Sequence, residues 1–81
     1  MNPNVTQVQV TLFSTSACHL CEEAEAILLQ AEITFLKSEI LDEGKLFDEY
    51  GFRIPVLKRS DNGEELDWPF DAASVNQFLV L

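Results

Sequence analysis

The chain opens with a regular alternation of polar and apolar residues that gives way to a helical spacing. From Gln7 to Phe13 every second residue is apolar, and this period of two predicts a β-strand. From Cys18 to about Ala31 the apolar residues recur every three or four positions, which predicts an amphipathic helix. The residues on that apolar face are Leu20, Ala24, Ile27, Leu28 and Ala31. A strand followed by a helix therefore begins the fold.

The next two segments are predicted to be a second strand and a short helix. Residues 33–40, ITFLKSEI, are rich in β-branched and aromatic side chains, which favour a strand. In the segment DEGKLFDEYG, Asp42 is the predicted N-cap of a short helix, and Gly51 stands where that helix should stop. Strand and helix thus alternate as far as Gly51.

The last third of the chain predicts a hairpin and a final helix. Two strand-like segments flank Asn62-Gly63, the dipeptide that best supplies the positive φ angles of a tight hairpin turn. Pro69 ends the second of these segments, and Asp71 is the predicted cap of a last helix. The apolar face of that helix comprises Ala72, Val75, Phe78 and Leu79.

This order of elements predicts a small α/β fold. A strand-helix-strand unit implies a parallel pair with a right-handed crossover, and a hairpin implies an antiparallel pair. The expected architecture is β-α-β-α-β-β-α, with a four-stranded mixed sheet flanked by helices. Because 81 residues leave room for only one hydrophobic core, residues 1–81 are expected to form a single domain.

Composition and charge narrow the range of partners. The chain carries 14 acidic and 5 basic residues, for a net charge of −9, which repels nucleic-acid phosphate and anionic lipid. We therefore expect no nucleic-acid or membrane partner. Such acidity favours solubility as a monomer, and the alternative interpretation is that it steers the protein toward a basic partner.

The compartment is expected to be the reducing cytoplasm. The chain has only two cysteines, too few for a disulfide-rich secreted scaffold. The N-terminal segment MNPNVTQVQV has neither the basic region nor the continuous apolar region of a signal peptide. No apolar run approaches the roughly 18 residues needed to span a bilayer.

The cysteines Cys18 and Cys21 lie where the strand pattern changes to the helix pattern. They fit a redox centre, part of a metal site, or an inert pair. Zinc needs about four ligands, but the only histidine is His19, and an iron–sulfur cluster would need sulfur ligands from outside the chain. A CxxC motif in a strand-helix-strand context favours redox chemistry and no bound metal.

The position of the two cysteines also predicts which one attacks. Unpaired N–H groups and the partial positive charge at a helix N-terminus stabilise a thiolate, and this favours Cys18 as the nucleophile. Cys21 lies one turn further along the helix and should be less exposed, which suits a thiol that resolves a mixed disulfide. Glu22 opposes thiolate formation, whereas His19 would assist it if protonated.

Several segments together resemble the glutaredoxin-like form of the thioredoxin fold, and in particular small glutaredoxin-like proteins of bacteria. They are the CHLC motif, the RIPVL segment with Ile54-Pro55 before the third strand, and the ELDWPFD segment before the last helix. The resemblance implies that Cys18 is the nucleophile and Cys21 the resolving thiol. It also implies a cis Pro55 beside the cysteines, with Ile54 pairing with an extended substrate. Arg53 is the basic residue nearest along the chain to the predicted cis-proline loop. It is a candidate either for contacting a substrate carboxylate or for pairing with surface acids.

The expected function is a thiol–disulfide oxidoreductase or electron carrier that acts on a protein or small-molecule disulfide. The alternative is a non-catalytic binding module of thioredoxin fold. Glutaredoxins usually carry a CPYC-like motif, Thr-Val-Pro and Gly-Gly, where this chain has CHLC, RIP and DWPF. The resemblance therefore supports thiol exchange more strongly than glutathione binding. No bound cofactor is expected, and glutathione is only a candidate reductant. Trp68 and Phe70 are expected in the core rather than as a wall of the site.

Overall fold

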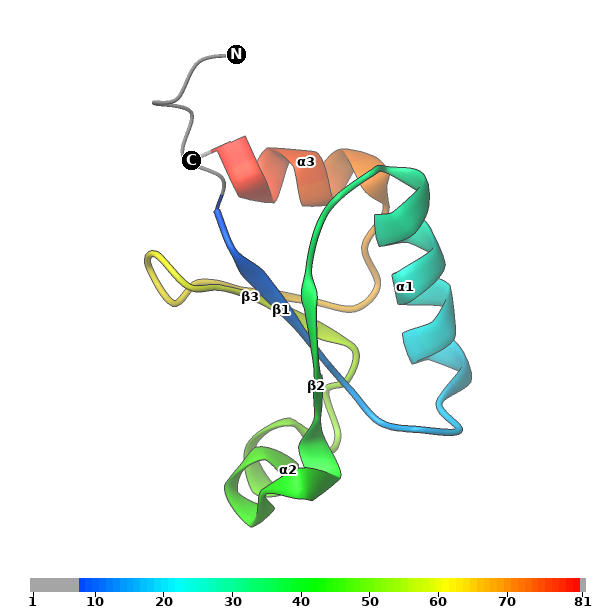
Figure 1. Cartoon of the computed structure of the whole chain (residues 1–81), viewed down its shortest axis with the longest axis vertical. Coiled ribbons are helices and arrows are strands. Elements are labelled where there is room, and N and C mark those ends of the chain that lie inside the picture. Colours follow the sequence, from blue (N-terminus) through cyan, green and yellow to red (C-terminus); the bar gives the residue numbers. More distant parts are fainter. Residues whose placement is uncertain (1–7, 81) are drawn as a thin grey trace.

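The computed structural model describes residues 8–80 and has the mixed sheet expected from the sequence (Figure 1). The sheet has four strands in the order β2-β1-β3-β4, with β1 and β2 parallel and the other neighbouring pairs antiparallel. Between residues 8 and 80, no helix combines the length and apolar character needed to cross a bilayer. The elements are β1 Val10–Ser14, α1 His19–Gln30, β2 Leu36–Glu39, the 3₁₀ turn η1 Ile40–Asp42, α2 Gly44–Tyr50, β3 Val56–Arg59, β4 Glu65–Asp67 and α3 Ala72–Val80.

The sheet separates two apolar clusters. Leu12 pairs with Leu57, and the next residue, Phe13, pairs with Val56; successive side chains of a strand point to opposite faces. The larger cluster, beside α1 and α3, comprises Val10, Leu12, Ala24, Leu28, Leu57, Phe70 and Val75. The smaller cluster, beside η1 and α2, comprises Phe13, Ile40, Tyr50 and Val56. Figure 1 shows α1 alongside the strands and α2 at the end of the sheet.

The first two strands are shorter than the alternation predicts. β1 begins at Val10 rather than Gln7, and Gln7 itself lies outside the described residues. The predicted second strand at 33–40 is reduced to Leu36–Glu39. At its start the N–H of Ile33 donates to the carbonyl of Leu28 at 2.9 Å, so this residue completes the end of α1 instead of joining the ladder. Side-chain pattern therefore extended both predicted strands beyond the residues of the regular ladder.

α1 lies within one residue of its predicted bounds, but its buried face differs. Cys18 is the N-cap and Ala31 the C-cap. Leu20, predicted to lie on the apolar face, is 45% exposed. Ala24 and Leu28 of the predicted face are buried, and the third buried position is Cys21; the three follow a helical i, i+3, i+7 spacing. Cys21 thus takes the place in the buried stripe that the prediction gave to Leu20.

The ends of α2 confirm one predicted boundary residue and correct another. Asp42 is not the cap of α2, because it forms the last residue of η1, and Glu43 occupies the N-cap position without a side-chain cap bond. Gly51 is the C-cap, as predicted. A Cβ atom at Gly51 would lie 2.6 Å from the carbonyl oxygen of Phe47, so the close approach of the backbone requires glycine there.

The hairpin between β3 and β4 forms around Asn62-Gly63, but its loop is wider than the predicted two-residue turn. Gly63 has φ +75°, as predicted, and its N–H donates to the carbonyl of Arg59 at 3.0 Å. The Asn62 side chain accepts the N–H of Glu64 at 2.9 Å. Asp61 is held by Arg59 through two hydrogen bonds. These side-chain contacts stabilise the longer loop.

α3 begins as the sequence predicts. The Asp71 carboxylate accepts the N–H of Ser74 at 2.8 Å, the hydrogen bond of an N-cap. Phe70 is 6% exposed, and Trp68 packs edge-to-face against it with ring centroids 5.0 Å apart. Both rings belong to or pack against the larger apolar cluster. Their predicted place in the core is confirmed.

Candidate active site

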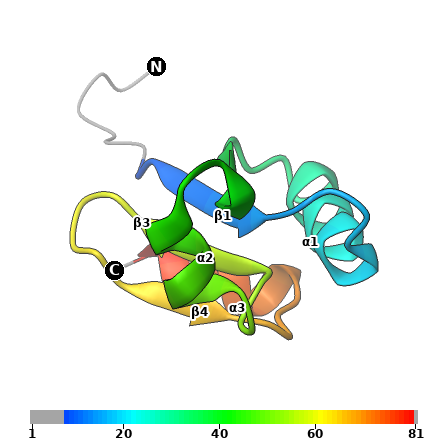
Figure 2. The same cartoon turned by 90° about the horizontal axis from the view of Figure 1, so that it is seen from below.

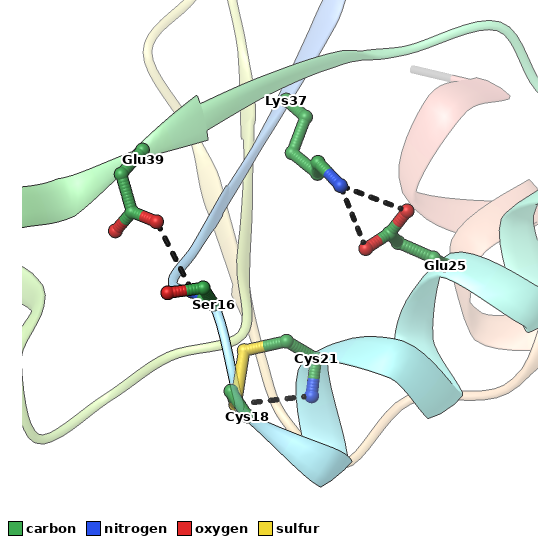
Figure 3. A network of polar contacts seen from close by, with 6 residues as sticks. All are labelled: Ser16, Cys18, Cys21, Glu25, Lys37 and Glu39. Carbon is green, nitrogen blue, oxygen red and sulfur yellow. Dashed lines mark hydrogen bonds and ion pairs between the residues drawn. A yellow bond between two sulfur atoms is a disulfide. The ribbon is translucent and has the colours of Figure 1, made fainter.

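The two cysteines form a disulfide at the junction of β1 and α1 (Figure 3). Cys18 is the N-cap of α1, and its sulfur accepts the N–H of Cys21 at 3.2 Å. The Cα atoms are 5.2 Å apart. Cys18 is half-buried, whereas Cys21 is only 1% exposed. The exposed member of the pair is therefore the one at the helix N-terminus, where unpaired N–H groups favour negative charge.

The loop before Cys18 has a strained backbone. Ala17 has φ +58°, in the left-handed region that costs a non-glycine residue about 1–2 kcal/mol. Cys18 then returns to extended backbone, with φ −108° and ψ 107°. This change of direction turns the chain from the end of β1 into the first turn of α1.

A cavity of about 370 Å³ opens beside the disulfide. Its walls come from the end of β1, the following loop, α1 and β2. Its lining residues are Ser14, Thr15, Ser16, Ala17, Cys18, Cys21, Glu22, Glu25, Lys37 and Glu39. Three carboxylates and one ammonium group line this space, so the surroundings of the disulfide are predominantly acidic.

An ion pair crosses the cavity from α1 to β2. Lys37 Nζ lies 3.3 and 3.2 Å from the two carboxylate oxygens of Glu25 (Figure 3). The Glu25 side chain is 27% exposed and that of Lys37 is 56% exposed. Lys37 reaches the cavity from a neighbouring strand, so its place beside the CxxC motif is not apparent from the local sequence.

Glu39 links the end of β2 to the loop that leads into Cys18. One carboxylate oxygen accepts the N–H of Ser16 at 3.0 Å, and the other accepts the N–H of Leu41 at 3.2 Å. The pKa of Glu39 lies below its usual value, because the Thr15 hydroxyl and the N–H groups of Leu41 and Ser16 stabilise the charged form. Glu39 was not among the residues predicted for the site. The available signal was a polar residue at the end of a strand parallel to β1.

His19 lies on the surface of α1, and its side chain is 83% exposed. Its Nε2 is 3.1 Å from a Glu23 oxygen, and its Nδ1 is 3.9 Å from a Glu22 oxygen. These contacts are ion pairs only when the imidazole is protonated. Among residues 8–80, no three His, Cys, Asp or Glu side chains are grouped so as to hold a metal ion.

The segment before β3 contains the three residues predicted to contact substrate. The Ile54-Pro55 bond is cis, as predicted. Pro55 is buried, and Ile54 packs against the smaller apolar cluster. Arg53 donates from Nη2 to Glu65 at 2.7 Å and to Asp67 at 2.6 Å. Of the two roles considered for Arg53, pairing with acids is present, and a substrate contact stays a prediction.

A buried tyrosine ties the same segment to the edge strand β4. The Tyr50 ring is 1% exposed and stacks on Phe13 with centroids 4.2 Å apart. Its hydroxyl donates to Glu65 at 2.5 Å. Burial and the neighbouring Glu65 raise the pKa of Tyr50 well above its usual value. The Tyr50 hydroxyl and the Arg53 guanidinium lower the pKa of Glu65.

Solved structures of two bacterial proteins are similar to this chain. The X-ray structure of the Northeast Structural Genomics target protein XcR50 from X. campestris has 42% sequence identity and a TM-score of 0.79, and covers 86% of this chain and 93% of that one. The solution structure of the same protein has a TM-score of 0.77. Protein Ne2328 from Nitrosomonas europaea is 27% identical with a TM-score of 0.73, and covers 98% of this chain and 99% of that one.

The family match extends over most of the chain. No curated protein matches this chain. Residues 9–80 match the family described as Glutaredoxin-like domain (DUF836), and the relatives of known structure share its fold. The cysteine pair, the cavity and the cis-proline segment all lie inside the matched residues. The chain therefore belongs to the glutaredoxin-like domain family.

Proposed function

We propose that the protein is a thiol–disulfide oxidoreductase or electron carrier in which Cys18 attacks a substrate disulfide and Cys21 resolves the mixed disulfide. The observation that carries this proposal is the disulfide at the N-terminus of α1. A half-buried sulfur at the helix cap and a buried sulfur one turn inside differ in access, which suits an attacking and a resolving thiol respectively.

The exchange proceeds in two balanced steps. The Cys18 thiolate forms a bond to one sulfur of the substrate disulfide, the substrate S–S bond breaks, and the departing substrate thiolate takes a proton from solvent. The Cys21 thiolate then bonds to Cys18 and releases the second substrate thiolate. The substrate is reduced to two thiols, the protein is oxidised to the Cys18–Cys21 disulfide, and an external dithiol returns it to the reduced form.

The substrate is a protein or small-molecule disulfide that approaches beside the proline segment. Ile54 and Pro55 are proposed to pair with an extended substrate backbone, and Arg53 is proposed to contact a substrate carboxylate. We expect the protein to act as a monomer in the reducing cytoplasm, without a nucleic-acid or membrane partner.

The reductant is proposed to be a protein dithiol rather than glutathione, and no cofactor is held between turnovers. The cavity beside the disulfide contains three carboxylates, which repel the carboxylates of glutathione. Lys37, the cation in that cavity, already pairs with Glu25. Comparing the rates of reduction by glutathione and by a thioredoxin tests this choice: faster reduction by glutathione contradicts it.

The central experiment measures thiol exchange and labels the two cysteines separately. We expect the pair to equilibrate with a thiol–disulfide redox buffer, and Cys18 in the reduced protein to react with iodoacetamide faster than Cys21 at every pH. Mass spectrometry locates the adduct. A Cys21→Ser variant should accumulate the mixed disulfide on Cys18. A pair that never forms an intramolecular disulfide, or equal labelling of both thiols, contradicts the mechanism.

A second candidate is a binding module that docks another protein without turnover. Large apolar side chains on η1, on α2 and in the loop after it are exposed, with Leu41 at 62%, Phe47 at 49% and Phe52 at 103%. Such side chains favour a protein contact. A Cys18→Ser variant separates the candidates: it retains the biological effect if binding alone is the function, and loses it if thiol exchange is required.

A further inference from the structure

Glu39 holds the loop before Cys18 from a different strand. In the parallel register of β1 and β2, Glu39 is the partner of Ser14, the last residue of β1. Its side chain crosses to the loop and accepts the N–H of Ser16 at 3.0 Å (Figure 3). Its second oxygen accepts the N–H of Leu41 at 3.2 Å. One carboxylate therefore connects the loop before Cys18 to the start of η1.

The conformation of Ala17 explains why this loop needs an anchor. Ala17 has φ +58°, a conformation that a non-glycine residue keeps only when the surrounding structure fixes it on both sides. On the C-terminal side, Cys18 is fixed by the helix, because its carbonyl accepts the N–H of Glu22 at 3.1 Å. On the N-terminal side, Ser16 is fixed by the Glu39 carboxylate.

We propose that Glu39 is a positioning residue for the redox pair: by holding Ser16 it keeps the loop in the conformation that presents Cys18 at the cap of α1. This inference rests on the proposed thiol exchange. Loss of the Glu39 contact frees the loop, so the two thiols spend less time within bonding distance, and their effective concentration toward each other falls. The dithiol–disulfide equilibrium then shifts toward the dithiol form.

Glu25 provides a matched control for the charge of Glu39. Both carboxylates line the same cavity beside the disulfide. Glu25 bonds to Lys37 instead of the loop. A Glu25→Gln change therefore removes one negative charge from the cavity and leaves the Ser16 contact intact, whereas Glu39→Gln removes the same charge and keeps one acceptor oxygen for a backbone N–H.

The experiment compares Glu39→Ala, Glu39→Gln and Glu25→Gln with the wild-type chain in the same redox buffer. Because a hydrogen bond to a charged group is lost, we expect Glu39→Ala to shift the dithiol–disulfide equilibrium about tenfold toward the dithiol. Glu39→Gln should give a smaller shift in the same direction, and Glu25→Gln should stay within about twofold of wild type. Urea midpoints report global stability. A purely structural role of Glu39 would lower the urea midpoint of the variant and leave its dithiol–disulfide equilibrium unchanged.

Two results overturn the proposal: an equilibrium within twofold of wild type for folded Glu39→Ala, or a shift for Glu25→Gln equal to that for Glu39→Gln, which assigns the effect to charge alone. If Glu39→Ala does not fold, Glu39→Gln decides by the same twofold limit. Amide hydrogen exchange at Ser16 tests the anchor by itself, with faster exchange expected in Glu39→Ala. An absence of any wild-type disulfide would instead overturn the proposed function, while the Ser16 measurement would still test the anchor.

Discussion

The two halves of the candidate site are held in place by different forces. The cysteine half rests on apolar packing, since Ala24 and Leu28 of α1 are fully buried against the sheet. The proline half adds hydrogen bonds and an ion pair to the apolar burial of Pro55, since Glu65 of β4 accepts from both Tyr50 and Arg53. Apolar burial is non-directional and insensitive to pH, whereas the polar network depends on geometry and on the protonation of Glu65.

Because of this difference, the stability of the fold and the local conformation of the proline half respond to different substitutions. The position of the CxxC helix is coupled to the larger hydrophobic cluster, so α1 can be displaced only at the expense of the whole fold, whereas the loop before Cys18 depends on the Glu39 contact. The segment before β3 is connected to the edge strand by side chains that extend to partly exposed carboxylates. We therefore expect substitutions in the polar network to change the proline half while the fold survives. Figure 2 shows α1 and α2, the helices on these two sides, well separated from each other.

The largest expected effect on stability comes from a substitution in the apolar packing of the cysteine half. Leu28→Ala should lower the free energy of unfolding by about 2–5 kcal/mol, because it removes buried methyl groups and leaves a cavity. Urea denaturation measures the change. Leu29→Ala is the matched control: Leu29 is the next residue on α1 and is 66% exposed, so its loss should change stability by less than about 0.5 kcal/mol. Equal effects of the two substitutions would contradict the assigned packing.

A smaller effect on stability is expected from a substitution in the polar network of the proline half. Tyr50→Phe keeps the ring stacked on Phe13 and removes only the hydroxyl that donates to Glu65. The free energy of unfolding should fall by about 1–2 kcal/mol, because a hydrogen bond to a charged acceptor is lost. In a Glu65→Gln background the same substitution should cost less, and a double-mutant cycle measures the difference. Additive effects would show that the two side chains are not coupled.

The smallest expected effect is the acid sensitivity of the proline half. The pKa of Glu65 is lowered in the folded chain, so its contribution to stability is present above its unfolded value and is lost as pH falls through the folded value. Between about pH 5 and pH 2.5 the wild-type chain should therefore lose more stability than Glu65→Gln. Urea midpoints across this pH range measure the difference. If the wild-type chain and Glu65→Gln lose stability in parallel, the acid sensitivity does not come from Glu65.

The order of the elements and the position of the cysteine pair were predictable from local patterns in the chain. Periodicity of two and of 3.6 is a local property, and it identified the first strand and α1 from side-chain spacing alone. The Asp71 cap and the positive φ of Gly63 were also predictable, because both depend on residues close in the chain. The difference in exposure between Cys18 and Cys21 followed from their places at the start of one helix.

The groups that surround that pair, and the residues where the strands end, depend instead on how distant segments pack together. Glu39 and Lys37 reach the disulfide cavity from β2, and Glu65 reaches Arg53 from β4. No local pattern identifies such neighbours, because the register of strands far apart in sequence brings them together. Arg59 is another example: it is 1% exposed and donates to the carbonyl of Phe78 in the last turn of α3. A charged residue in a strand is usually exposed; Arg59 is buried because Asp61 pairs with its charge and because the packing of α3 supplies a further acceptor.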